Sequence, residues 1–173
     1  MQQFEYSDIS RMLTPILARH GGDASRLLQV LLEVQDACHT ISPEAIDRIA
    51  AHFEVPRVNV EGVAGFYSFL STQPVGEYRM LFSSNITDQM LGKDDLMQYL
   101  CNKLWVEPGK VSEDGLVSVD STSCTGMCDQ GPAALVNGWP LTSLDQNRLD
   151  LICELIRARR PVAAWPTMLF EVA

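Results

Sequence analysis

Apolar residues recur every three or four positions over residues 7–71, which predicts helices rather than strands. The first predicted helix begins at Ser7-Asp8 and ends at Gly21-Gly22, and a second follows directly. A third begins at Ser42-Pro43, because proline is favoured at the first position of a helix. Val55-Pro56 ends that helix. Helices joined by connections this short pack together as a small bundle.

The pattern changes after Gln73-Pro74-Val75-Gly76. From there, short apolar runs bounded by turn residues predict strands, and longer runs with helical spacing predict helices. The predicted strands are Tyr78–Phe82, Leu116–Val119 and Ala133–Val136, and the predicted helices are Lys93–Leu104 and Asp145–Arg159. The order strand, helix, strand, strand, helix suits a thioredoxin-like α/β sandwich. The predicted fold class is therefore α+β, with an N-terminal helical bundle followed by a thioredoxin-like α/β domain.

We expect three parts in the chain. Residues 1–72 form the helical bundle, residues 73–160 the thioredoxin-like domain, and residues 161–173 an apolar C-terminal tail. The tail is too apolar for a free, solvated end. Together with the aromatic segment Phe66–Phe69, it is predicted to contact a partner, because exposed apolar patches usually mark interfaces.

Composition narrows the functional class. The chain has 173 residues and a formal net charge of −9, which argues against general nucleic-acid binding, since that needs a basic surface. We find no apolar run of membrane-spanning length and no secretory signal at the N-terminus. Five cysteines without a regular framework spacing fit a reducing compartment, so we expect a cytoplasmic protein.

The strongest chemical signal is the segment 121–132, in which Cys124 and Cys128 flank Gly126. A glycine lets the loop bend so that both sulfurs approach one point. Thiolates favour iron–sulfur clusters, zinc or copper, but a closed cluster or zinc site needs four ligands and this loop offers two. The other cysteines, Cys38, Cys101 and Cys153, fall at apolar helix positions and are predicted to be inert core thiols.

Several segments together resemble one known family. They are Val34-Gln35-Asp36, Ile41-Ser42-Pro43, Val63–Phe69, Pro74–Tyr78 and Cys124–Pro132. This series is similar to the thioredoxin-like 2Fe–2S subunit of NADH dehydrogenases, which also occurs in NAD-linked hydrogenases and formate dehydrogenases. The resemblance covers roughly residues 24–158. It implies a four-helix N-terminal segment, a thioredoxin-like domain, a 2Fe–2S cluster, and docking beside a flavin- and NADH-binding subunit.

The sequence departs from that family at the first cysteine pair. The resemblance implies two cysteines five positions apart after the first strand of the sandwich, and the matching positions here are Ser83 and Asp88. Serine and carboxylate oxygens are hard ligands, whereas the cluster prefers soft sulfur. We therefore expect the fold to be retained and the cluster to be lost. A mixed-ligand cluster held by Ser83, Asp88, Cys124 and Cys128 is the alternative.

Two functions from different classes follow. The first is a non-catalytic, accessory subunit of an NAD(H)-dependent oxidoreductase, in which the partner holds FMN and NAD. The chain itself has no glycine-rich dinucleotide loop and no acid–base constellation. The second is a thiol–disulfide protein that uses Cys124 and Cys128, although Ser83 and Asp88 hold the place where thioredoxin-like proteins carry their reactive pair. A metal site formed by Cys124, Cys128 and Asp88 is a third possibility.

Overall fold

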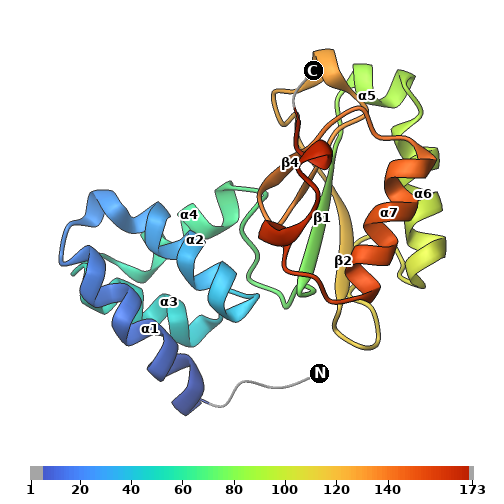
Figure 1. Ribbon diagram of the computed structural model, residues 1–173. Coiled ribbons are helices and arrows are strands. Elements are labelled where there is room, and N and C mark those ends of the chain that lie inside the picture. Colours follow the sequence, from blue (N-terminus) through green and yellow to red (C-terminus); the bar gives the residue numbers. More distant parts are fainter. Residues whose placement is uncertain (1–5, 172–173) are drawn as a thin grey trace. The chain divides into compact units, whose positions relative to one another are not determined.

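The structure is a computed structural model that describes residues 6–171. Their contacts divide the chain into two compact units, with the boundary between Pro74 and Val75. The first unit is helical and the second contains the sheet (Figure 1). None of the helices in the described range is both long and apolar enough to cross a membrane.

The helical unit follows the predicted apolar spacing. Its helices are α1 (Tyr6–His20), α2 (Leu27–Cys38), α3 (Pro43–His52) and α4 (Arg57–Phe66), with a short 3-10 turn at Ala24–Arg26. Helix α3 begins where the sequence predicts, because Ser42 Oγ accepts a hydrogen bond from the backbone N–H of Ala45 at 3.2 Å. The residues inside this unit are aliphatic and fully buried: Leu13, Val30, Leu31, Val34, Ile41, Ile49 and Val60.

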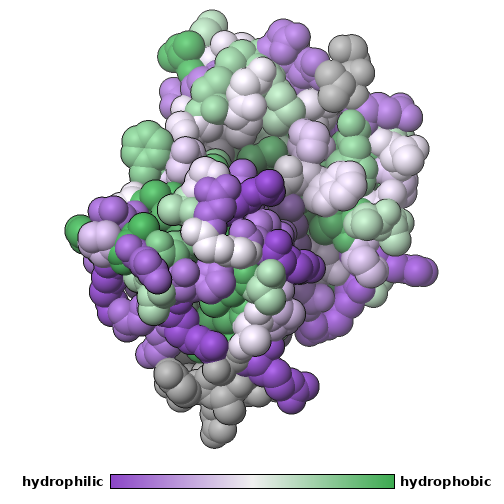
Figure 2. Space-filling view, turned by 90° about the vertical axis from the view of Figure 1, so that its left-hand side faces the viewer, coloured by the Kyte–Doolittle hydropathy of each residue, from purple (hydrophilic) through white to green (hydrophobic). Residues whose placement is uncertain are grey.

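Phe66, at the end of α4, is 79% exposed. It lines an open groove of about 570 Å³ together with Leu27, Val55, Val63 and Tyr67. On the face drawn in Figure 2, hydrophobic (green) residues are interspersed with hydrophilic (purple) ones. Tyr67 is half-buried against the core of this unit, so the aromatic segment is only partly exposed.

The second unit is built around four strands. They are β1 (Tyr78–Ser83), β2 (Val117–Thr122), β3 (Ala134–Val136) and β4 (Trp139–Leu141), in the order β2-β1-β3-β4. Strands β1 and β2 are parallel, and the other two pairs are antiparallel. The helices are α5 (Ile86–Met90), α6 (Lys93–Leu104) and α7 (Gln146–Arg157). Short 3-10 turns occupy Cys128–Gln130, Val162–Ala164 and Thr167–Leu169.

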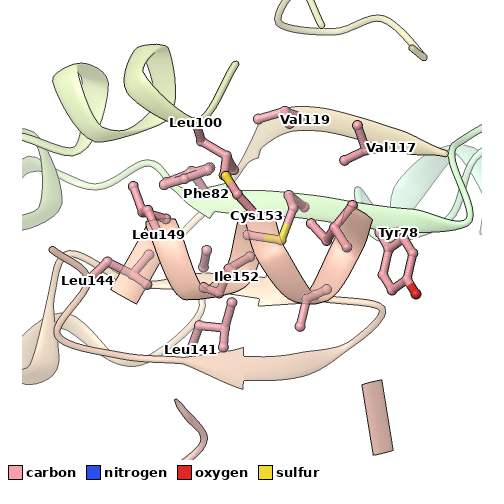
Figure 3. Close-up of a cluster of buried hydrophobic side chains, with 14 of the residues drawn as sticks. Tyr78, Phe82, Leu100, Val117, Val119, Leu141, Leu144, Leu149, Ile152 and Cys153 are labelled. Carbon is pink, nitrogen blue, oxygen red and sulfur yellow. The ribbon is translucent and has the colours of Figure 1, made fainter. Parts of the chain in front are cut away.

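Helices α6 and α7 lie side by side against the sheet (Figure 1). Figure 3 shows the resulting core, in which Leu149, Ile152 and Cys153 of α7 point toward Phe82 of β1 and Leu100 of α6. Helix α7 is fixed at its start because Asp145 accepts a hydrogen bond from the backbone N–H of Arg148 at 2.7 Å. Burial of these apolar side chains provides most of the stabilisation of this unit.

Gly76 approaches strand β2 at its beginning. A Cβ atom on Gly76 would lie 2.4 Å from the carbonyl carbon of Val117. Its own N–H donates a hydrogen bond to Ser118 Oγ at 3.1 Å. This close approach of two backbones explains why glycine stands at the entry to β1.

The outer side of β2 is covered by the segment that precedes it. Val111 and Ser118 form an isolated antiparallel bridge. The backbone N–H groups of Gly109 and Ser112 donate to the carbonyl oxygens of Val119 and Val117, both at 2.8 Å. The opposite edge of the sheet is β4, which has three residues and contains Pro140.

The structure places the main apolar residues of the C-terminal tail inside the sheet unit, where the sequence predicted an exposed apolar patch. Val162, Trp165 and Leu169 are buried in the core of the sheet unit. The ring of Trp165 stacks near Tyr78, with 6.0 Å between the ring centroids. The Tyr78 hydroxyl and Trp165 Nε1 both donate to the carbonyl oxygen of Arg160 at 2.8 Å. These tail residues therefore stabilise their own unit.

Two elements were not predicted. Helix α5 occupies part of the segment between Phe82 and Lys93, for which no helix or strand was predicted. Strand β4 directly follows the Asn137-Gly138 turn, in which the two residues have positive φ angles of 47° and 82°. The predicted α+β class, with N-terminal helices followed by a mixed sheet with helices, is confirmed.

Candidate functional site: the cysteine loop beside the end of strand β1

The loops that follow β1 and β2 begin at the same edge of the sheet. Ser83 ends β1 and pairs with Thr122, which ends the parallel strand β2. The N–H of Ser84 donates to the carbonyl oxygen of Thr122 at 2.9 Å, and Thr125 N donates to Ser83 Oγ at 3.3 Å. The cysteine loop, which follows β2 and contains Cys124 and Cys128, is thus attached to Ser83. Ser83 is the first of the two positions at which the resemblance implies a cysteine.

Cys124 and Cys128 lie together within this loop. Their Sγ atoms are 3.1 Å apart, and the two cysteines are not disulfide-bonded. Gly126, between them, has a φ angle of +84°, a conformation that favours glycine and turns the loop back on itself. Cys124 is exposed and Cys128 is partly exposed, so solvent reaches this pair.

Asn85 is the residue that joins the two loops. Its Nδ2 lies 3.2 Å from Ser83 Oγ and 3.7 Å from Cys124 Sγ, and it also donates a short hydrogen bond to Asp88 Oδ2. Its Oδ1 accepts from the backbone N–H of Asp88 at 2.9 Å and so caps α5. One amide side chain therefore contacts three of the four candidate ligand positions.

Asp88 is fully buried and both of its carboxyl oxygens accept hydrogen bonds. Oδ1 accepts from the backbone N–H of Ala133 at 3.1 Å, and Oδ2 accepts from Asn85. A Cβ atom on Gly131 would lie 2.5 Å from Asp88 Oδ1, so the carboxyl group fits closely against that glycine. Because a buried carboxylate is costly unless it is hydrogen-bonded, these contacts explain how Asp88 is tolerated inside the unit.

The environments of the five thiols differ. The Cys128 thiol and the backbone N–H of Gly126 donate to Cys124 Sγ, which lowers the pKa of Cys124. The pKa of Cys128 is raised, first because its thiol hydrogen is engaged by Cys124 and then by burial. Burial raises the pKa of Cys101 and Cys153 to about 11 and also raises the pKa of Cys38.

The structure places the predicted site residues in one neighbourhood through Asn85. Ser83 contacts the cysteine loop directly, and Asp88 and Cys124 contact the same Asn85 amide. The Cys128 sulfur contacts the Cys124 sulfur. Within residues 6–171, no three or more His, Cys, Asp or Glu side chains are grouped so that they could hold a metal ion. Asn85 was not predicted from the sequence, although asparagine is a preferred N-cap residue and Asn85 caps α5.

The donor set can be compared with the needs of a 2Fe–2S cluster, which takes four thiolates in most proteins. Two soft sulfurs are present, and the two remaining positions are oxygens already used in hydrogen bonds to the protein. The hydroxyl of Thr125, in the same loop, is buried and has no hydrogen-bond partner. This arrangement favours thiol chemistry at Cys124 and Cys128 over a four-ligand cluster.

The similarity to known proteins extends over both units of the chain. Residues 13–157 match the thioredoxin-like 2Fe-2S ferredoxin family. The chain is 32% identical over 156 residues to NADH-quinone oxidoreductase subunit 2 of Thermus thermophilus, covering 88% of this chain and 86% of that protein. It is 26% identical over 150 residues to the alpha subunit of the NAD-reducing hydrogenase HoxS of Cupriavidus necator.

The chain is also similar in structure to NAD+-reducing hydrogenases. The chain superimposes on the crystal structure of an air-oxidised NAD+-reducing NiFe-hydrogenase with a TM-score of 0.75 and 32% sequence identity, over 86% of this chain. It spans only 25% of that hydrogenase chain and 25% of the HoxS alpha subunit, so these relatives contain much additional sequence.

Proposed function

The chain belongs to the thioredoxin-like 2Fe-2S ferredoxin family, and on that premise we propose that it is an accessory subunit of a multi-subunit NAD(H)-dependent oxidoreductase. The complex is of the NADH dehydrogenase or NAD-reducing hydrogenase type. The observation that carries this proposal is the match to the Thermus thermophilus subunit, which covers 86% of that protein. A relative matched over most of its length supports a similar position in a complex better than a shared fold does.

The catalytic chemistry belongs to a partner in this proposal. The subunit docks on a flavin- and NADH-binding subunit, which holds FMN and NAD. The chain has no glycine-rich dinucleotide loop. Its three histidines, His20, His39 and His52, belong to the helical unit and not to the cysteine loop.

We further propose that this member of the family carries no resident 2Fe–2S cluster. Ser83 Oγ accepts hydrogen bonds from Thr125 N and Asn85, and Asp88 accepts from Ala133 N and Asn85. A metal bound by these oxygens would have to replace those bonds inside a buried site. Oxygen ligands are also poorly matched to a cluster that prefers thiolate. The role of the subunit is then structural.

The test is a purification of the full-length protein from its native host, by an affinity tag, under anaerobic conditions. We expect a complex that contains a flavoprotein, oxidises or reduces NAD(H), and has no iron assignable to this chain. Iron is assigned by comparing the reduced-state EPR spectrum of the wild-type complex with that of a complex carrying Cys124→Ser. Identical spectra are expected.

Two results would contradict the proposals separately. A chain that purifies alone, with no flavoprotein, contradicts the assignment as a subunit. A complex whose 2Fe–2S EPR signal disappears in the Cys124→Ser variant contradicts the loss of the cluster and supports mixed oxygen and sulfur ligation. The matched control is Cys153→Ser, which alters a buried thiol in α7 and should leave both the assembly and the spectrum unchanged.

A further inference from the structure

We propose that Cys124 and Cys128 form a reversible intrachain disulfide, which makes the cysteine loop a thiol switch oxidised by small-molecule disulfides. This inference goes beyond the role as a subunit, and it rests on the proposed absence of a resident 2Fe–2S cluster, because sulfurs that hold a cluster are not free to form a disulfide. It rests on the distance between the two sulfurs, on their access to solvent and on the burial of the other thiols.

The two sulfurs are already close to bonding distance. Their separation is 3.1 Å, and a disulfide bond is about 2.05 Å long, so the pair must close by roughly 1 Å. Gly126 supplies the turn that brings them together, and nothing lies within 4 Å of the position where its Cβ would be. The loop therefore has room to adjust when the bond forms.

Exposure selects this pair among the five cysteines. Cys124 is exposed and Cys128 partly exposed, whereas Cys38, Cys101 and Cys153 are 4%, 1% and 2% exposed. An oxidant in solution therefore meets Cys124 first. The N–H groups of Asn85 and Gly126 point at Cys124 Sγ from 3.7 and 3.4 Å, where they stabilise a sulfur that carries negative charge.

The reaction is a pair of thiol–disulfide exchanges. Cys124, as the thiolate, attacks one sulfur of a small disulfide RSSR, so that the RS–SR bond breaks, a mixed disulfide forms and RS⁻ leaves. Cys128, as the thiolate, then attacks Cys124 Sγ, which forms the intrachain bond and releases the second RS⁻. Two electrons pass from the protein to RSSR, and the two protons from the cysteine thiols end on the two RSH products.

The experiment exposes the full-length reduced protein to oxidised glutathione and counts free thiols after denaturation. The reduced protein has five. We expect three after oxidation, which are the buried Cys38, Cys101 and Cys153, and we expect dithiothreitol to restore all five. Mass spectrometry of the digested protein should find the new bond between Cys124 and Cys128 within one chain.

Single variants separate the two sulfurs. Cys128→Ser should stop at the mixed disulfide, with one glutathione attached to Cys124. Cys153→Ser is the matched control, and it should lose the same two thiols as the wild-type protein. The proposal is overturned if the wild-type protein keeps five thiols, if Cys124 bonds instead to a second molecule, or if Cys124→Ser loses thiols to the same extent.

Discussion

The backbone N–H of Ala133 donates a hydrogen bond to Asp88 Oδ1 at 3.1 Å, and so a side chain of α5 is tied to the residue that precedes β3. Asp88 is the position at which the family resemblance implies a cysteine. In our proposal, a hydrogen-bonded carboxyl group connects these elements at the position where the resemblance implies a metal-bound sulfur. Two of the predictions below test this replacement.

Asp88→Ala should lower the free energy of unfolding by about 1–3 kcal/mol, because the buried N–H of Ala133 loses its acceptor. Urea denaturation followed by circular dichroism measures the change. The control is Glu113→Ala, which removes an exposed carboxylate from the same unit and should change stability by less than about 0.5 kcal/mol. Equal stability of the two variants would show that the Asp88 contacts contribute nothing.

The double substitution Ser83→Cys with Asp88→Cys should create a 2Fe–2S site. Together with Cys124 and Cys128, the two new cysteines provide four thiolates at the same edge of the sheet. Before reconstitution the variant should unfold at a lower temperature than the wild-type protein, because it lacks the Asp88 carboxyl. After anaerobic reconstitution we expect two irons per chain, the visible absorption of the cluster, and recovered thermal stability.

The single change Ser83→Cys is the control for that experiment and should not take up a stoichiometric cluster. Failure of the double variant to bind iron would indicate that the Asn85 amide, which contacts Ser83, Asp88 and Cys124, occupies the space that a cluster needs. Adding Asn85→Gly to the double variant separates two explanations. If iron then binds, the Asn85 amide blocked the site; if iron still does not bind, positions 83 and 88 are not the ligand positions of the loop.

Gly76→Ala should destabilise the sheet unit by about 1–3 kcal/mol, because the new Cβ would lie 2.4 Å from the backbone of Val117. Gly62→Ala is the same chemical change in helix α4, where nothing lies within 4 Å. There, alanine should raise stability by about 0.5–1 kcal/mol, since glycine is a poor helix former. Thermal unfolding of both variants gives the comparison.

Trp165→Ala should lower the free energy of unfolding by about 3–5 kcal/mol, since it removes a buried indole and a hydrogen bond to Arg160. The control is Trp105→Ala, because Trp105 is 89% exposed and its loss should matter little. If the two tryptophan variants were equally stable, the tail would not belong to the core of the sheet unit.

Stability should fall as the pH rises from about 9 to about 11. Cys101 and Cys153 have an ordinary thiol pKa of 9.0 in the unfolded chain, and burial raises the pKa of each to about 11 in the folded chain. The unfolded state therefore loses its thiol protons first. The stabilising contribution of the protonated thiols is complete below pH 9 and is lost as the pH passes through 11.

The measurement for that prediction is urea denaturation at several pH values. The double variant Cys101→Ala with Cys153→Ala should show a shallower loss of stability over the same range than the wild-type protein. Parallel pH profiles would mean that other groups, such as tyrosines and lysines, account for the alkaline loss.

Much of the fold was predictable because local signals and apolar spacing agree. Ser42-Pro43 and Asp145 mark helix starts by capping, and Asn137-Gly138 marks a turn by its tolerance of positive φ angles. Strand β4 was missed because Pro140 within a three-residue run argues against a strand. The sheet order puts β4 at an edge, where proline is allowed.

The candidate site was only partly predictable, for a different reason. The Cys124 and Cys128 pair is visible in the sequence because its spacing is local. Asn85 acquires its importance only when the parallel pairing of β1 and β2 places two distant loops together. The burial of Trp165 is likewise decided by where the chain returns after α7, and composition alone could not distinguish a buried tail from an exposed one.

The two edges of the sheet limit how this protein can associate with others. The segment before β2 already supplies backbone partners for Val117–Val119 on one edge, and the three-residue β4 with Pro140 offers little main chain on the other. Addition of a strand from another molecule is therefore disfavoured at both sides, which protects the isolated protein from edge-to-edge aggregation. We therefore expect its contacts with other subunits to be made away from the sheet edges, so that surface substitutions can separate assembly from folding.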